Sequence, residues 1–130
     1  MRRVLVIDDD PTVAKAISDL VNVAGGYGDV AITSEQAVEK IKNRDFDTVL
    51  IDFQLENRQT AVDVLRECGD CLTDKRVVVF TGHRDMPGLK EIDHIYKVEH
   101  VLFKPIHMPH VRLILADEMP ERAVAYEPIR

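Results

Sequence analysis

Short apolar runs punctuate the chain and are separated by stretches in which apolar residues recur at helical spacing. Four runs are rich in β-branched or aromatic residues and show no alternation with polar residues: Val4–Ile7, Thr48–Ile51, Val77–Phe80 and Val101–Phe103. Such runs are typical of strands buried on both faces of a parallel sheet. A weaker fifth run, Val30–Thr33, follows a glycine-rich segment. The pattern therefore predicts five strands.

The segments between these runs predict helices. The apolar face of the first consists of Val13, Ile17, Leu20, Val21 and Ala24. Gly25 is placed to end this helix, because glycine readily adopts the left-handed backbone found at helix C-termini. The motif Thr33-x-x-Gln36 predicts a capping box at the start of the second helix. Pro109 suits the first turn of the last helix, and two further helices are expected over Ala61–Cys68 and Leu89–Tyr96.

Strand and helix alternate along the whole chain, which implies a parallel sheet with helices on both faces. The ends of the strong strands lie 29 residues apart from Ile51 to Phe80 and 23 apart from Phe80 to Phe103, about one strand–helix unit each. The 44 residues from Ile7 to Ile51 leave room for two helices and the weak strand. The sequence predicts one doubly wound, five-stranded α/β domain.

Polar residues follow each strong strand directly. They are Asp8, Asp9 and Asp10 after the first strand, then Asp52, Thr81 and Lys104 after the other three. In an open parallel sheet the carboxyl ends of the strands lie at one edge, and ligands bind there near the point where the strand order reverses. We therefore expect a functional site at this edge.

The residue types at this edge narrow its chemistry. Three neighbouring carboxylates repel one another, which raises a pKa unless a cation lies between them. An oxygen-only set of ligands suits a hard ion, Mg²⁺ before Ca²⁺. The ammonium of Lys104 is suited to a phosphoryl oxygen, and the hydroxyl of Thr81 can donate a hydrogen bond. Together these groups point to phosphoryl transfer to an aspartate.

Composition and charge exclude other function classes. The 130 residues include 17 Lys plus Arg and 23 Asp plus Glu, a formal net charge of −6. This balance argues against a nucleic-acid or anionic-membrane surface. No apolar run approaches the roughly 20 residues of a membrane span, and the N-terminus lacks the pattern of a signal peptide. We expect a cytoplasmic protein with no nucleic-acid or membrane partner.

In combination, these motifs resemble the receiver domain of bacterial two-component response regulators. The matching residues are the pair Asp8-Asp9, then Asp52, Thr81-Gly82 and Lys104-Pro105 after the third, fourth and fifth strands. The likeness covers about residues 3–118. It implies a (βα)5 flavodoxin-like fold with strand order 2-1-3-4-5, a receiver domain over residues 1–118 and a C-terminal tail over residues 119–130.

The resemblance also implies roles for individual residues. Asp52 would accept a phosphoryl group from a sensor histidine kinase or a histidine phosphotransfer protein. Thr81 and Lys104 would bind the phosphoryl oxygens, and the Lys104–Pro105 peptide bond would be cis. A Mg²⁺ ion would be held by Asp8, Asp9, Asp52 and the backbone carbonyl of Gln54.

The same resemblance implies a signalling protein and not an enzyme, apart from catalysis of its own phosphorylation and dephosphorylation. The residues after position 118 are too few for a DNA-binding output domain in this sequence. The signal is therefore expected to pass by contact with a downstream protein, and a homodimer is compatible with the sequence.

Three positions depart from the usual receiver pattern. Glu56 stands where the family usually has proline, and Thr60 where it usually has glycine, which leaves the conformation of the loop after the third strand open. Val101 replaces an aromatic residue that turns inward on phosphorylation, so we expect a readout without that movement. These departures keep a second hypothesis open: a degenerate receiver that binds partners without being phosphorylated.

A third hypothesis belongs to a different class of protein. The motif Asp8-x-Asp10-x-Thr12 after an apolar strand also matches haloacid-dehalogenase-type phosphatases, with Asp8 as the nucleophile. That family inserts a flap after this motif, whereas here Pro11 opens a helix at once, for which Asp10 is a good N-cap. It also needs an acidic motif after a later strand, which this sequence lacks. Only the receiver hypothesis gives Asp52 a role.

Two further motifs have structural interpretations. The segment Cys68-Gly69-Asp70-Cys71 has the spacing of a redox motif. It falls at the end of a helix, where the helix dipole does not lower a thiol pKa, so we interpret both cysteines as structural. His107 and His110 are separated by Pro109, which argues against a shared helical face, and we expect both to be solvated.

Overall fold

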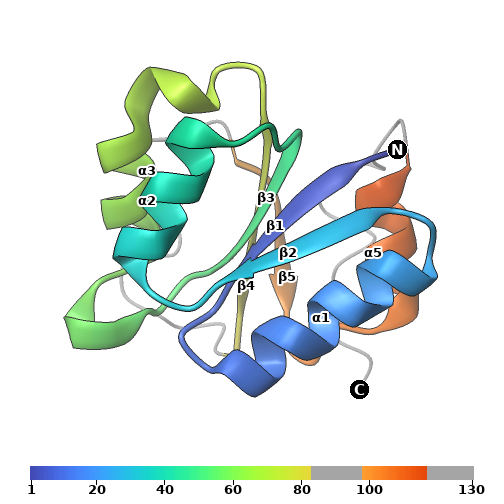
Figure 1. The fold of residues 1–130 in the computed structure, drawn as a ribbon. Coiled ribbons are helices and arrows are strands. Elements are labelled where there is room, and N and C mark those ends of the chain that lie inside the picture. The colour runs from blue at the N-terminus through green and yellow to red at the C-terminus, as the bar shows by residue number, and fades with distance from the viewer. Residues whose placement is uncertain (83–97, 117–130) are drawn as a thin grey trace.

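The computed structural model describes residues 1–82 and 98–116, and this part of the chain forms one five-stranded parallel sheet (Figure 1). The strand order β2-β1-β3-β4-β5 confirms the predicted fold and topology. The strands are β1 Arg3–Ile7, β2 Tyr27–Ala31, β3 Thr48–Asp52, β4 Arg76–Thr81 and β5 Val98–Phe103. The α-helices are α1 Pro11–Val23, α2 Ser34–Asn43, α3 Ala61–Cys68 and α5 Met108–Leu115. The helix expected over Leu89–Tyr96 and the tail over residues 119–130 lie outside the described residues.

Helices cover both faces of the sheet. Figure 1 shows α1 and α5 on one face and α2 and α3 on the other. Successive residues of β1 point to opposite faces: Leu5 and Ile7 join the core under α2 and α3, whereas Val4 and Val6 join the core under α1 and α5. All of these side chains are fully buried, which explains why the run shows no polar alternation. No helix in the described ranges combines the length and apolarity needed to cross a bilayer.

The predicted signals bound α1. Asp10 caps its N-terminus, where the carboxylate accepts a hydrogen bond from the Thr12 amide at 2.9 Å. Gly25 has a φ of 98°, and its amide donates to the Asn22 carbonyl at 3.2 Å. Because this left-handed conformation costs glycine little, the helix ends where the sequence predicts.

The capping box predicted for α2 is half formed. The Thr33 hydroxyl accepts a hydrogen bond from the Gln36 amide at 3.0 Å, as expected. The side chain of Gln36 reaches back to the amide of Ile32, at 3.1 Å, and not to that of Thr33. Both bonds still satisfy backbone donors near the start of the helix.

β2 begins and ends earlier than predicted. The expected run was Val30–Thr33, whereas the strand covers Tyr27–Ala31. The prediction was wrong because Gly28 and Asp29 are residue types that are depleted in strands. Gly28 is there for packing against α1: a Cβ at this position would lie 2.6 Å from the Ser18 hydroxyl oxygen and 2.8 Å from the Ser18 carbonyl oxygen.

His110 was expected to be solvated, and that prediction was wrong. Its side chain is buried, and its Nδ1 accepts a hydrogen bond from the His107 amide at 3.0 Å. Pro109 lies in the first turn of α5, where a missing amide hydrogen does no harm, so the helix continues through it. The two imidazole rings stack with centroids 6.1 Å apart.

Cys68 has the buried, structural character that the sequence predicts, whereas Cys71 is exposed. Cys68 is buried at the end of α3, and burial raises the pKa of its thiol to about 11. Cys71 is exposed, and both thiols are free. A thiol with a raised pKa is a poor nucleophile at neutral pH, so Cys68 lacks the chemistry of a redox motif.

Candidate functional site

The sheet brings the predicted site residues to one edge. Asp8 and Asp9 follow β1, and Asp52 is the last residue of β3. Thr81 ends β4 and pairs in register with the last residue of β5, which places Lys104 one residue further on. A pocket of about 300 Å³ opens at this edge, lined by Asp9, Asp52, Gln54, Leu55, Thr81, Gly82 and Lys104. We refer to it as the strand-edge pocket.

Lys104 is the electrostatic centre of this pocket. Its Nζ lies 2.9 Å from Oδ2 of Asp52 and 3.3 Å from Oδ2 of Asp8. The backbone fixes the root of the side chain, because the Lys104 amide donates to the Thr81 carbonyl at 2.8 Å. The Lys104–Pro105 peptide bond is cis, as the resemblance implies. One ammonium therefore bridges carboxylates from two different strands.

The carboxylates differ in accessibility. Asp8 is 1% exposed and both of its oxygens are engaged, Oδ1 by the Asp10 amide at 2.9 Å and Oδ2 by Lys104. Asp52 is 5% exposed but lines the pocket, and Asp9 is exposed. One oxygen from each of the three lies within 4.8 Å of the others. Oxygen atoms from three carboxylates at this spacing fit a hard divalent cation.

Burial and mutual repulsion disfavour the charges of these acids. Burial raises the pKa of Asp52 and of Asp8, and the hydrogen bonds and positive charge of Lys104 only partly oppose this. The pKa of Asp9 is raised by partial burial and by the neighbouring Asp8 carboxylate. Burial alone would lower the pKa of the Lys104 ammonium, but the two carboxylates outweigh it and raise that pKa. One ammonium thus faces three acids, an imbalance that a bound cation would relieve.

Thr81 and Gln54 complete the predicted set. Thr81 is 2% exposed and lines the pocket from the end of β4. Gln54 lines it from the other side, in the loop after β3, where its backbone pairs with that of Thr60. The pocket is therefore lined by all the predicted site residues except Asp8, which contacts the Lys104 ammonium.

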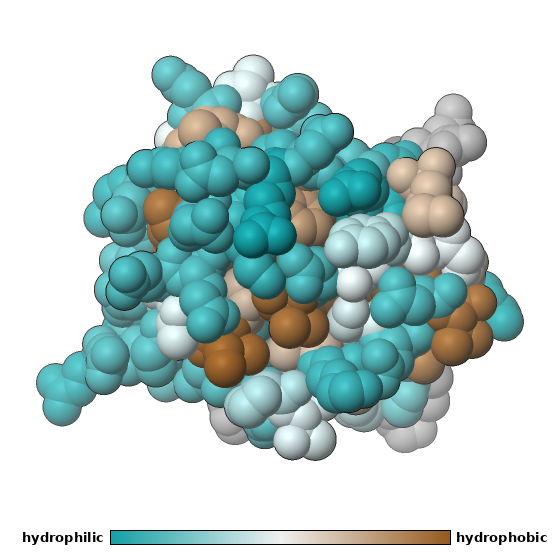
Figure 2. Space-filling view, viewed as in Figure 1, coloured by the Kyte–Doolittle hydropathy of each residue, from teal (hydrophilic) through white to brown (hydrophobic). Residues whose placement is uncertain are grey.

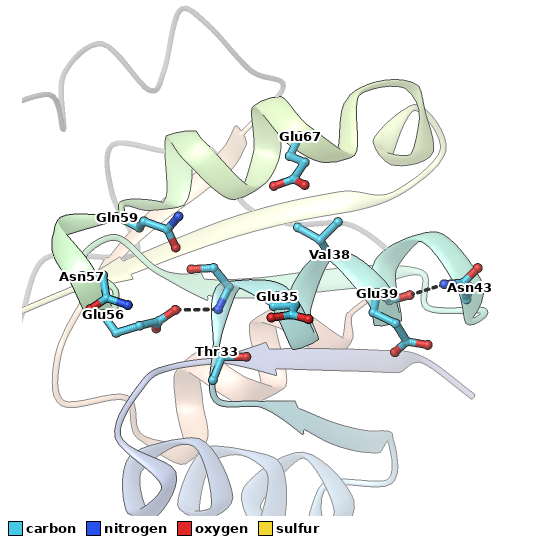
Figure 3. Close-up of a pocket in the computed structure, with 10 residues that line it drawn as sticks. Thr33, Glu35, Val38, Glu39, Asn43, Glu56, Asn57, Gln59 and Glu67 are labelled. Atoms are coloured by element: carbon cyan, nitrogen blue, oxygen red, sulfur yellow. Dashed lines mark hydrogen bonds between the residues drawn. The ribbon is translucent and has the colours of Figure 1, made fainter.

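The loop after β3 is ordered without the usual proline and glycine. The Glu56 carboxylate turns to α2, where Oε1 accepts a hydrogen bond from the Ser34 amide at 2.7 Å (Figure 3). The Leu55 amide donates to the Gln59 carbonyl at 2.8 Å. Thr60 opens α3, and its amide donates to the Asp63 carboxylate at 2.8 Å. Sequence reasoning missed the role of Glu56 because its partner is 22 residues away and no local pattern links the two.

Val101 occupies the position where the family usually carries an aromatic side chain. It lies on β5 opposite Val79 of β4 and is half-buried against the core under α2 and α3. An aliphatic side chain in this place has neither a ring nor a hydroxyl to couple to Thr81.

Comparison with known proteins identifies the class of protein that this fold and pocket define. The family model of the response regulator receiver domain matches residues 4–116. The chain belongs to this family of signalling modules. No curated protein sequence matches the chain.

Solved structures agree on the fold. A receiver domain from Clostridium thermocellum is 25% identical, with a TM-score of 0.74 over 85% of this chain and 88% of that one. A CheY-like receiver domain from Methylobacillus flagellatus is 19% identical, with a TM-score of 0.77 over 88% and 96%. One from Methanospirillum hungatei JF-1 is 18% identical, with a TM-score of 0.75 over 83% and 85%.

Proposed function

We propose that this protein is a phosphorylation-competent receiver in which Asp52 accepts a phosphoryl group from a sensor histidine kinase or a histidine phosphotransfer protein. The observation that carries the proposal is the position of the Asp52 carboxylate, which lines an open pocket with the Lys104 ammonium 2.9 Å away. The pocket gives a phosphodonor access to this carboxylate, and the ammonium is available for the incoming phosphoryl oxygens.

The transfer needs few groups. A carboxylate oxygen of Asp52 attacks phosphorus, the bond from phosphorus to the donor imidazole nitrogen breaks, and the electron pair stays on that nitrogen. The Lys104 ammonium and the Thr81 hydroxyl hold the phosphoryl oxygens in line for this displacement. Lys104 can serve in this way because its raised pKa keeps it protonated at neutral pH.

The same pocket fits Mg²⁺. The ligands would be Asp8, Asp9, Asp52 and the backbone carbonyl of Gln54, and the three carboxylates already place oxygens within 4.8 Å of one another. When bound, Mg²⁺ supplies positive charge that offsets the charge of the phosphoryl group and of the acids. The raised pKa values of the three acids support this assignment, because burial first and mutual repulsion second disfavour their charges, and a bound cation would offset both.

The geometry argues against the phosphatase hypothesis. Asp8, its nucleophile, is 1% exposed, and both of its oxygens are engaged by Asp10 and Lys104. Asp10, its acid–base group, is occupied as the N-cap of α1. Neither side chain is free to take part in hydrolysis, whereas Asp52 faces the pocket.

Phosphorylation by a small phosphodonor tests the assignment. With acetyl phosphate and Mg²⁺, we expect one acid-stable, base-labile phosphoryl group per wild-type chain, detected by intact mass. Asp52→Asn should abolish it, whereas Asp10→Asn should retain it, because asparagine also caps helices. A phosphoryl group that persists in Asp52→Asn and disappears in Asp8→Asn would support the phosphatase hypothesis instead.

The signalling context follows from family membership. A receiver passes its signal through protein contact, so we propose a downstream protein partner and a cytoplasmic location shared with the kinase. A homodimer stays a prediction, which the elution volume with and without acetyl phosphate would test.

A further inference from the structure

A second and larger hollow lies between α2 and α3, away from the strand-edge pocket. Its volume is about 640 Å³, within the range of built binding sites. We refer to it as the α2–α3 groove. Its lining consists of Thr33, Ser34, Glu35, Val38, Glu39, Asn43, Glu56, Asn57, Gln59 and Glu67. In Figure 3 Glu67 projects from α3 toward the α2 wall, while Glu56 closes one end.

The charge of this lining is one-sided. It contains four glutamates and no basic residue. Neither lysine of α2 belongs to the lining. Lys40 is engaged elsewhere, with the Asp29 carboxylate at 3.1 Å and the Val30 carbonyl at 2.7 Å, and Lys42 is exposed near Cys68 of α3. Figure 2 shows a mainly hydrophilic surface over α2 and α3. The groove is therefore a polar, anionic channel between two helices.

A metal ion does not fit this charge pattern. Among the described residues, only Asp8, Asp9 and Asp52 bring three carboxylate oxygens close enough together to share one ion. The glutamates of the groove are instead spread along two helices and a loop. An elongated cationic segment matches that distribution better than a point charge does.

Two buried oxygen atoms line the groove without a hydrogen-bond partner. Ser34 is 9% exposed, and neither its Oγ nor Oε2 of Glu56, both buried, has a hydrogen-bond partner among the described residues. Burial raises the pKa of Glu56, but hydrogen bonds from backbone amides, first that of Ser34, outweigh it and lower that pKa. The carboxylate is thus ionised with one oxygen unpaired, an arrangement that is costly unless a donor arrives.

We infer that the α2–α3 groove docks an arginine-bearing segment of a partner protein, with the half-buried Glu56 as the anchor. A planar guanidinium offers five donors, so one arginine can pair with the Glu56 carboxylate while it also bonds neighbouring groups. Glu35, Glu39 and Glu67 then meet further basic residues of the same segment along the walls. Lysine, a compact and strongly hydrated point charge, pairs with the Glu56 carboxylate and its neighbours less well.

The groove also shares a loop with the strand-edge pocket. Gln54 and Leu55 line the pocket, and Glu56, Asn57 and Gln59 line the groove. Asn57 and Arg58 both have left-handed backbones, with φ of 56° and 63°. Docking does not require a phosphoryl group on Asp52, so this inference stands or falls independently of the proposed function.

Titration with a basic peptide tests the groove. The probe is an acetylated and amidated peptide with three arginines spaced by alanines, added to the isotope-labelled full chain at physiological salt, with amide shifts followed by NMR. We expect saturating shifts at Ser34, Val38 and Gln59. Glu56→Gln, which keeps the acceptor for the Ser34 amide, should weaken binding by on the order of tenfold. Asp19→Asn removes the same charge from α1, on the other face of the sheet, and should leave the affinity unchanged.

Three further arms make the test decisive. Glu39→Gln with Glu67→Gln should also weaken binding, and these changes leave the Glu56–Ser34 contact intact. The same peptide with lysines should bind more weakly, and Asp52→Asn should bind like the wild type. Shifts scattered over the acidic surface and equally reduced by Asp19→Asn would show mere charge attraction and overturn the inference. So would the absence of binding at millimolar peptide.

Discussion

At the scale of single residues, the strand-edge pocket holds more negative than positive charge. Three carboxylates converge within 4.8 Å, and Lys104 pairs with two of them. Asp9 makes no ion pair with Lys104 within 4.0 Å, and its pKa is raised by partial burial and by Asp8. The native fold thus disfavours the ionised form of Asp9. A residue that lowers stability in this way is explained by a function and not by stability.

Asp9→Asn is expected to stabilise the metal-free protein by up to about 1 kcal/mol, the scale of interactions between partly exposed charges. The reason is the loss of repulsion with Asp8 and Asp52. Mg²⁺ should raise the melting temperature of the wild type but barely change that of the variant, because a ligand that binds only the native state stabilises it.

Asp74→Asn is the matched control, since it removes an exposed acid that precedes β4, whereas the pocket lies at the other end of that strand. Thermal melts with EDTA and with Mg²⁺ give both comparisons. A destabilised Asp9→Asn in EDTA, or a Mg²⁺ response equal to that of the wild type, would contradict this view of the site.

At the scale of elements, close contacts and caps decide where strands and helices lie. β2 lies against α1 because Gly28 has no side chain to meet Ser18. α5 begins at Met108, after the N-cap His107, whose amide hydrogen is accepted by the buried His110 ring. Gly28 looks unfavourable for a strand and His110 looks solvated in the sequence. Each is explained by one contact, with Ser18 and with the His107 amide respectively.

Gly28→Ala is expected to lower the free energy of unfolding by about 1–3 kcal/mol, the usual cost of overpacking. The added Cβ would lie 2.6 Å from the Ser18 hydroxyl oxygen and 2.8 Å from the Ser18 carbonyl oxygen. Adding Ser18→Ala should recover only part of the loss, because the contact with the backbone remains. Urea titrations would measure the free energy of unfolding of the wild type, of Gly28→Ala and of the double variant. A Gly28→Ala protein within about 0.5 kcal/mol of the wild type would show that α1 moves away freely.

The cap of α5 should make stability depend on pH. Burial lowers the pKa of His110 below its ordinary 6.5, and the neighbouring His107 adds to this. The unfolded chain then binds a proton that the native state rejects, so the contribution of His110 is present above pH 6.5 and is lost as pH falls toward the folded pKa.

We expect His110→Asn, which keeps an acceptor for the His107 amide, to flatten this decline as the pH falls below about 6.5. Urea titrations across that window measure it, and His107→Asn, which removes only the smaller contribution of His107 to the pKa of His110, should flatten the decline less. An equally steep decline in both variants and the wild type would show that His110 is not responsible.

At the scale of the whole molecule, the sequence predicts the features that follow from repeated hydrophobic patterns, namely the buried strands and the sheet that they form. Buried strands such as β1 and β3 have uninterrupted apolar runs, and a parallel sheet must bring their carboxyl ends together, so the meeting of Asp8, Asp52 and Lys104 could be foreseen. The edge strand β2 could not be placed correctly, since its Gly28 is explained only by contact with α1.

Contacts between residues far apart in the sequence were beyond prediction for a related reason. The hydrogen bond from the Ser34 amide to Glu56 joins the start of α2 to the loop after β3, and neither residue carries a signal for the other. From the sequence Glu56 was only a departure from the family pattern. In the structure it explains how that loop is held and why the α2–α3 groove has an unpaired acceptor.

The most direct test of the central claim is the binding of beryllofluoride, a phosphoryl mimic, followed by fluorine NMR. A phosphorylation-competent receiver should show a bound resonance that requires Mg²⁺, is absent in Asp52→Asn and is strongly reduced in Lys104→Ala. Asp10→Asn should retain it. A wild-type protein without the bound resonance at saturating Mg²⁺ would contradict the account and identify a degenerate receiver.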